Sequence, residues 1–301
     1  MTDLAPLQKE QVLRGLPQPG EARPARRREG FWRRFFSLPA AVFGLLMLLF
    51  LIAIALSAPL IAPGDPFATS DDVLLRPSAQ YPFGTDDLGR DVFRAVIHGA
   101  RTSLLVGLLA AGSALALGVL IGASAGYAGG LLDDALMRIT EMFQIVPRFF
   151  LVLVIVSLLG SNLWLVILLL GLTFWPGIAR LLRGQVLSIR SRDYVLAARA
   201  IGVPEHTILV RHVLPGALPP IITQAALLVG SAIVVEAGLS FLGLGDRSVV
   251  SWGALLNDAQ QFVRTAWWMS VFPGLAITMT VLTLNLIADG INEAWDPRLQ
   301  S

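Results

Sequence analysis

Residues 196–215 read LAARAIGVPEHTILVRHVLP and lie between two long apolar blocks. A Gly-Val-Pro step divides the stretch in two, and a proline closes it. Gly202 can take the left-handed backbone conformation that ends a helix, and Pro204 suits the first turn of the next helix, where its missing N–H leaves no hydrogen bond unmade. Pro215, followed by Pro219 and Pro220, is expected to end this second helix before the next apolar block. The stretch therefore predicts two short helices, joined by a tight turn, between two membrane spans.

The composition of the whole chain is that of an integral membrane protein. Of its 301 residues, 55% are hydrophobic and 15% are charged, and the mean hydropathy is +0.69; soluble domains carry about 25% charged residues. A helix needs about 20 apolar residues to cross the hydrocarbon of a bilayer. The segments that meet this length are 39–62, 102–127, 135–159, 163–183, 217–243 and 266–288. The sequence thus predicts an all-α polytopic membrane protein with six transmembrane helices.

The distribution of basic residues predicts the orientation of these spans. Most of the 23 Lys and Arg residues fall in the N-terminal tail, in the region 180–211 or near the C-terminus, and cytoplasmic segments carry the excess of Lys and Arg in membrane proteins. Both termini and the stretch 196–215 are therefore expected in the cytoplasm. The predicted division is a basic tail (1–38), a first transmembrane anchor (39–62), an external segment (63–101), a five-helix core (102–288) that contains a cytoplasmic loop (184–216), and a C-terminal tail (289–301).

The external segment contains an amphipathic stretch, FGTDDLGRDVFRAVIHGAR at 83–101. Thr85 or Asp86 could cap a helix there, and Leu88, Val92 and Val96 follow one another at four-residue intervals on one face. The pattern predicts an interfacial helix that leads into the second span.

Several kinds of chemistry are excluded by what the chain lacks. It has no cysteine, and its single lysine is Lys9, so the phosphate-binding motif G-x-x-x-x-G-K-[ST] cannot form. The three histidines lie outside the apolar blocks, which leaves Ser240 without a base for a protease dyad within the membrane. No catalytic, cofactor-binding or metal-binding residue is therefore predicted, and the chain is not expected to be an enzyme.

The second span carries glycines at a strict four-residue interval: Gly118, Gly122, Gly126 and Gly130. Small residues at this interval form a smooth ridge that lets another helix approach closely. The ridge predicts a packing seam against another span or a partner subunit. The alternative is that these are ordinary glycines of a membrane helix.

The stretch 196–215 resembles the EAA loop of bacterial ABC importer permeases, whose pattern is E-A-A-x-x-x-G-x(9)-I-x-L-P. The matching positions are Ala197, Ala198, Gly202, Leu214 and Pro215. Leu196 stands where the pattern has glutamate, and His212 stands where it has isoleucine. The isoleucine position is also histidine in the peptide-type members, whereas the missing glutamate is a departure from the family.

Further stretches resemble one subfamily, the C-type permease of dipeptide, oligopeptide and nickel importers. They are FGTDDLGRDVF (83–93), GARTSLLVG (99–107), LSFLGLG (239–245), SWGALL (251–256) and ADG…DPRL (288–299). The resemblance extends from about residue 31 to residue 299. It implies the type I ABC importer permease fold and a multi-pass location in the bacterial inner (plasma) membrane.

The resemblance also implies a set of partners. A paralogous permease subunit would complete the path, two cytoplasmic ATPase subunits would bind ATP and Mg, and an external solute-binding protein would deliver the solute; lipid surrounds the chain, and nucleic acid is not expected. The loop would dock on an ATPase subunit through Tyr194, Ala197, Ala198, Arg199, Gly202, Leu214 and Pro215. The solute stays open among dipeptides, oligopeptides, nickel chelates and glutathione.

Polar residues at membrane depth are candidates for the translocation path, because charge is costly there. Glu141, Gln144 and Arg148 are spaced to share one face of the third span, and Pro147 is expected to kink it. We expect this stripe and Glu236 to face the path; the alternative is structural ion pairs or caps. A secondary, ion-coupled transporter or a channel is the alternative function, but a secondary transporter would need relay carboxylates and internal repeats, and Glu236 is the only carboxylate well inside a span.

Overall fold

The computed structural model describes residues 30–295, and in this part of the chain the only β-type pairing is an isolated bridge between Thr85 and Asp91. The long helices are α3 (Pro39–Leu56), α5 (Val92–Ala128), α8 (Leu163–Arg190), α12 (Pro219–Leu239) and α14 (Trp268–Trp295). The shorter helices are α2 (Phe31–Ser37), α4 (Ala58–Ile61), α6 (Gly130–Ile145), α7 (Arg148–Leu159), α9 (Asp193–Ala200), α10 (Glu205–Ile208), α11 (Leu214–Ala217) and α13 (Trp252–Ala259). The all-α prediction is confirmed.

Five of these helices are long and apolar enough to cross a membrane, and α6 and α7 together make a sixth span if the pair is counted as one. The two helices of the pair are bent by 74° relative to each other. The predicted third span, 135–159, is therefore broken rather than kinked. Val146 is extended because it precedes Pro147, and a residue before proline is disfavoured in the helical region.

The second span begins earlier than predicted. Helix α5 starts at Val92, where the side chain of Asp91 accepts hydrogen bonds from the backbone N–H groups of Phe93 and Arg94. The separate interfacial helix capped by Thr85 or Asp86 is not present, because residues 83–91 are not helical and residues 92–101 belong to α5. At about 1.5 Å per residue, the 37 residues of α5 extend well beyond a bilayer core of about 30 Å.

The glycine ridge of α5 packs against α8 of the same chain. A Cβ atom on Gly118 would lie 2.5 Å from the Cβ of Ile178, and a Cβ on Gly126 would lie 2.9 Å from the carbonyl oxygen of Arg183. Gly122 faces the backbone of α8 in the same way. Gly130 is not part of the ridge, because the chain leaves α5 at Gly129 and both residues have positive φ. The ridge is therefore a seam within the subunit.

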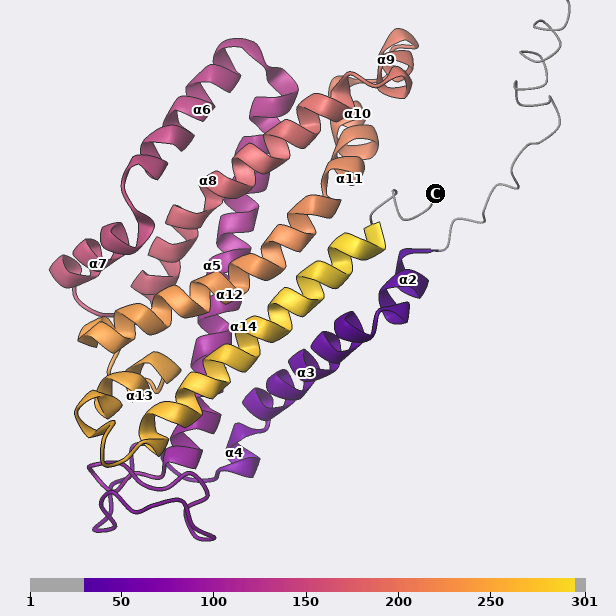
Figure 1. Ribbon diagram of the computed structural model, residues 1–301. Helices are drawn as coiled ribbons and strands as arrows, with labels where there is room; N and C mark the ends of the chain where they lie inside the picture. Colours follow the sequence, from indigo (N-terminus) through magenta and orange to yellow (C-terminus); the bar gives the residue numbers. More distant parts are fainter. Residues whose placement is uncertain (1–29, 296–301) are drawn as a thin grey trace, which may run out of the picture.

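The helices form an elongated bundle in which α12, α14 and α3 lie side by side (Figure 1). The loop that contains α9 to α11 projects from one end, which we name the loop end. Helix α2 packs against the last residue of α14 there, with the Phe31 and Trp295 rings 4.5 Å apart. The predicted tails 1–38 and 289–301 thus include helical residues, while 1–29 and 296–301 lie outside the described residues. The segment 63–91 and α13 lie at the opposite end (Figure 1).

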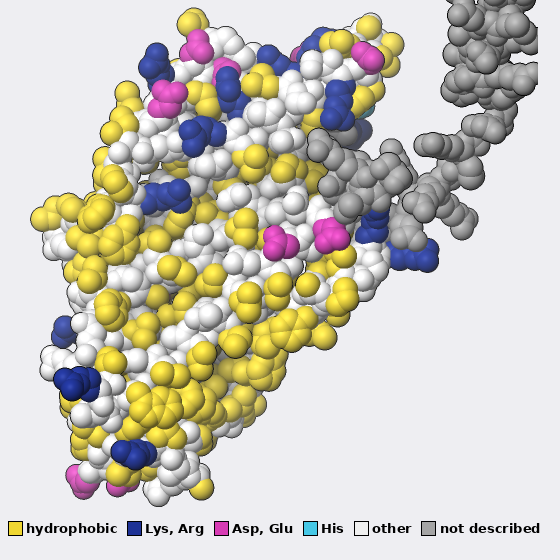
Figure 2. Space-filling model, in the orientation of Figure 1, with side chains coloured by type: hydrophobic (Ala, Val, Ile, Leu, Met, Phe, Trp, Pro, Cys, Tyr) yellow, Lys and Arg dark blue, Asp and Glu magenta, His cyan; other side chains and the backbone are white. Residues whose placement is uncertain are grey.

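The exposed surface agrees with a membrane position. Hydrophobic side chains cover the middle of the face in Figure 2, and most charged side chains gather toward the two ends. Large apolar side chains on the outer helices are exposed, including Leu60 at 84%, Leu120 at 66% and Leu158 at 78%. Patches of this extent on a monomer mark contact with lipid or with other subunits.

Candidate functional site

The α9–α11 loop, residues 191–218, is held in shape by the turn at Gly202. This residue has φ +84°; its N–H donates to the carbonyl of Arg199 at 3.0 Å, and the N–H of Val203 donates to the carbonyl of Ala198 at 3.1 Å. This pair of bonds is the Schellman arrangement that ends a helix on a left-handed residue. The predicted turn is confirmed, although the loop begins after Arg190 rather than at 184, because α8 is longer than predicted.

Pro215 does not end the second short helix, contrary to the prediction. Residues 209–213 form a π-helical turn, in which the N–H of Leu214 donates to the carbonyl of Leu209. The extra residue in this turn makes room for the proline ring, which would otherwise clash with the preceding turn. The backbone stays helical through Leu218 into α12. The loop therefore continues into this span with no break in the helical backbone.

Helix α9 has one face toward the bundle and one toward solvent. Val195 and Ala198 are buried, whereas Tyr194 is 47% exposed, Leu196 47% and Ile201 82%. The Tyr194 hydroxyl donates to the carbonyl of His212 at 3.2 Å and so braces α9 against the π-helical turn. The predicted loop residues Ala197 and Pro215 are exposed and Leu214 is half-buried. The outward face is an apolar surface on an otherwise polar loop.

A polar cluster joins the loop to the end of α5. Arg199 donates two hydrogen bonds to the Glu205 carboxylate, at 2.7 and 3.1 Å, and the Tyr127 hydroxyl donates to the same carboxylate. The Arg199 hydrogen bond, followed by the one from Tyr127, lowers the pKa of Glu205 to about 2. The lowered pKa keeps the Glu205 carboxylate ionised at neutral pH, where it forms an ion pair with Arg199.

A second contact binds the same turn of α5. The guanidinium of Arg190, the last residue of α8, donates to the carbonyls of Gly126 and Tyr127 at 2.9 and 3.0 Å. These carbonyls are at the C-terminal end of α5, where the helix itself provides no donors. Sequence reasoning missed Arg190, Tyr127 and Glu205, because partners 63 to 78 residues apart leave no local periodic signal.

The predicted path residues are not brought together. The break before Pro147 separates Gln144 on α6 from Arg148 on α7, so the expected stripe is not formed. Glu141 and Gln144 are exposed on α6, while the Arg148 guanidinium lies over the Phe174 ring of α8, 4.8 Å from its centroid. A role for Gln144 and Arg148 in the path stays a prediction.

Glu236 lies inside the subunit rather than on its surface. Its exposed fraction is 3%, and its Oε1 accepts a hydrogen bond from the Ser240 hydroxyl at 2.7 Å. A role for Glu236 in the path between two permeases stays a prediction. Ser240 is the first residue of the π-helical turn at 240–244.

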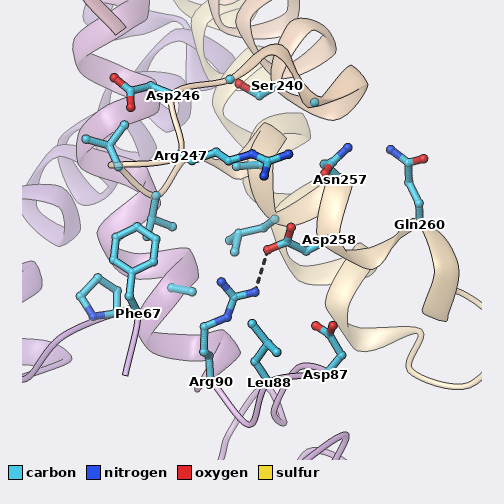
Figure 3. A pocket seen from close by; sticks show the side chains of 18 of the residues that line it. Phe67, Asp87, Leu88, Arg90, Ser240, Asp246, Arg247, Asn257, Asp258 and Gln260 are labelled. Atoms are coloured by element: carbon cyan, nitrogen blue, oxygen red, sulfur yellow. Dashed lines mark hydrogen bonds and ion pairs between the residues drawn. The ribbon is translucent and has the colours of Figure 1, made fainter. Parts of the chain in front are cut away.

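At the opposite end, a polar pocket of about 550 Å³ lies between α13, the segment 63–91 and the chain that follows α12. The Arg90 guanidinium donates to Asp258 at 2.7 Å and also pairs with Asp86. Arg247 lies across the pocket from Asp87 (Figure 3). The pocket gives this end of the bundle charged groups of both signs beside apolar walls.

Comparison with known proteins identifies the family to which the chain belongs. Residues 118–301 match the family described as "Binding-protein-dependent transport system inner membrane component", and residues 28–77 match "N-terminal TM domain of oligopeptide transport permease C". The chain belongs to the family of binding-protein-dependent transport permeases and is the membrane-embedded permease subunit of an ABC importer.

Individual relatives cover nearly the whole chain. The dipeptide transport system permease protein DppC of Bacillus subtilis is 40% identical over 89% of this chain and 85% of that protein. The glutathione transport system permease protein GsiD of Pectobacterium atrosepticum is 37% identical over 90% and 91%. An inward-facing structure of the MetNI methionine ABC transporter is 18% identical, covers 67% of this chain and 97% of that chain, and has a TM-score of 0.55. This likeness confirms the type I importer permease fold.

Proposed function

We propose that this chain moves di- and oligopeptides, or closely related small solutes, into the cell as one half of a permease heterodimer. The observation that carries the proposal is similarity over about nine-tenths of the chain to permeases named for dipeptides, di/tripeptides and glutathione. All of these solutes are short peptides, so a path suited to a zwitterionic peptide backbone explains the whole set. Both termini are cytoplasmic in this proposal.

The α9–α11 loop is the contact with a cytoplasmic ATPase subunit in this proposal. Tyr194, Leu196 and Ile201 expose apolar surface on α9, and an exposed apolar surface on a polar loop suits a protein groove. ATP and Mg are bound by the two ATPase subunits, since this chain has no lysine where a phosphate-binding loop would need one. The opposite end, with its polar pocket, receives an external solute-binding protein.

Reconstitution tests the proposal. The chain is purified with its partner permease, the two ATPase subunits and the solute-binding protein, placed in proteoliposomes, and given labelled dipeptide, glutathione or a nickel chelate. Uptake of peptide or glutathione that requires ATP and the binding protein is expected. Uptake driven by an ion gradient without ATP, or uptake of the nickel chelate alone, contradicts the proposal.

A further inference from the structure

Residues before and after α9 contact the last turn of α5. Arg190 stands just before the loop and donates to the Gly126 and Tyr127 carbonyls. Glu205 stands after the turn at Gly202 and accepts from the Tyr127 hydroxyl. A single helical turn, residues 126–127, is therefore bound by residues on either side of α9.

These hydrogen bonds constrain the position of the loop on α5 more closely than the apolar contacts alone would. The inner face of the loop, including Val195 and Ile208, packs in the main core, and apolar contacts are non-directional. The Tyr127, Glu205 and Arg190 bonds have defined donors and acceptors, and the carboxylate is held from its other side by Arg199. Hydrogen bonds to charged groups are also stronger than neutral ones. The polar contacts therefore give the loop directional attachments to α5.

Helix α5 connects this contact with the other end of the bundle. It is continuous from Val92 to Ala128, which is about 55 Å at 1.5 Å per residue. Near its first turns, the Trp252 indole of α13 donates to the Val96 carbonyl at 3.0 Å, and the Trp252 N–H donates to the Ser103 hydroxyl at 3.3 Å. One unbroken helix thus links the loop to the wall of the polar pocket in Figure 3.

We propose that Tyr127, Glu205 and Arg190 are positioning residues through which α5 follows the loop. When an ATPase subunit displaces the loop, the bonds to residues 126–127 move that end of α5 with it, and α5 moves the α13 region at the far end. Coupling then uses Glu205, at a position that the EAA pattern leaves unspecified, and the α5 contact it makes, as well as the direct connection into α12. The inference rests on the proposed function, because it assigns the route by which ATPase closure reaches the pocket end.

Two variants isolate the contact in the reconstituted transporter. Tyr127→Phe removes one hydroxyl, and Glu205→Gln keeps the shape of the side chain but removes its charge. Each is expected to lower solute uptake about fivefold or more, the low end of coupling between linked sites, while ATP hydrolysis and thermal stability stay at the wild-type level.

Tyr81→Phe is the matched control. It also removes a tyrosine–carboxylate hydrogen bond, from Tyr81 to Asp72 at 2.8 Å, but away from the loop and at two residues that do not line the polar pocket. Its ratio of solute transported to ATP hydrolysed is expected to equal that of the wild type. A fall in this ratio in Tyr127→Phe but not in Tyr81→Phe supports the inference.

The outcomes separate the inference from the proposed function. If Gly202→Val abolishes ATP-driven uptake while Tyr127→Phe and Glu205→Gln keep the wild-type ratio, the inference is overturned and the proposed function stands. A parallel loss of uptake, ATP hydrolysis and thermal stability in Tyr127→Phe also overturns it, because the residue is then only structural. If uptake needs no ATP in the wild type, the proposed function itself fails.

Discussion

Gly202→Val is the most direct test of the α9–α11 loop. The φ of +84° at this position is a conformation in which a side chain costs about 1–2 kcal/mol, and more for a β-branched residue. In the described part of the chain, no atom lies within 4 Å of where a Cβ would sit. The cost of the substitution is therefore conformational and includes no steric clash.

A cost of 1–2 kcal/mol lowers the equilibrium ratio of the tight turn to other loop conformations about 5- to 30-fold. If the loop must hold this shape to transmit ATPase closure, uptake falls by up to this factor while ATP hydrolysis continues. A graded series is expected at Gly202, in which asparagine retains most uptake, alanine less and valine least, because asparagine tolerates the left-handed region. Uptake and ATP hydrolysis are measured together in proteoliposomes at matched subunit abundance.

Gly160→Val serves as the matched control, since Gly160 also has positive φ, +93°, and an open site, but it lies between α7 and α8 at the opposite end. It carries the same kind of strain away from the loop and is expected to keep the wild-type ratio of uptake to ATP hydrolysis. Wild-type uptake by Gly202→Val refutes the coupling role. If the ratio of uptake to ATP hydrolysis falls equally in both variants, the effect comes from backbone strain in general and not from the loop.

Three further expectations concern the membrane part of the chain. Gly122→Ala sets a methyl group against the backbone of α8 and is expected to destabilise the subunit by about 1–3 kcal/mol in thermal unfolding, whereas Gly112→Ala, on the open side of α5, is expected to be neutral or slightly stabilising. Arg183→Met leaves the buried Asp133 carboxylate without its bidentate partner. The single variant is therefore expected to unfold at a lower temperature than the double variant Arg183→Met with Asp133→Leu, which has no unpaired buried charge. Equal unfolding temperatures of the two variants contradict this. Arg148→Leu is expected to lower uptake at normal abundance, since charge at membrane depth is retained for function, and unchanged uptake excludes it from the path.

Local rules predicted those features of the fold that depend on a few neighbouring residues. The spans follow from apolar length, the turn at Gly202 from the freedom of glycine, and the ridge of Gly118, Gly122 and Gly126 from its four-residue interval. The break at Pro147 was predicted in position, because proline acts on the residues beside it. Its angle of 74° was not, since packing of the flanking helices determines it.

The start of α5 shows where local rules were insufficient. Thr85, Asp86 and Asp91 are all suitable caps, and distant contacts decide between them. The Thr85 hydroxyl accepts from the Leu75 N–H and donates to the Asp72 carbonyl, while Asp86 accepts from two N–H groups of its own turn. Only Asp91 is left to cap the helix. The Thr85 contacts lie ten and thirteen residues away in the chain, so they cannot be read from the helix sequence.

The leucine at the glutamate position of the EAA pattern follows from the geometry of the loop. Leu196 is 47% exposed and lies three residues before Arg199 on α9, so a glutamate there would be within reach of the Arg199 guanidinium. In this chain Arg199 is already occupied by Glu205, which also binds the end of α5. A second carboxylate would compete for the same cation and weaken the contact to Tyr127. An apolar residue at 196 therefore leaves Arg199 committed to Glu205 and extends the outward apolar surface of α9.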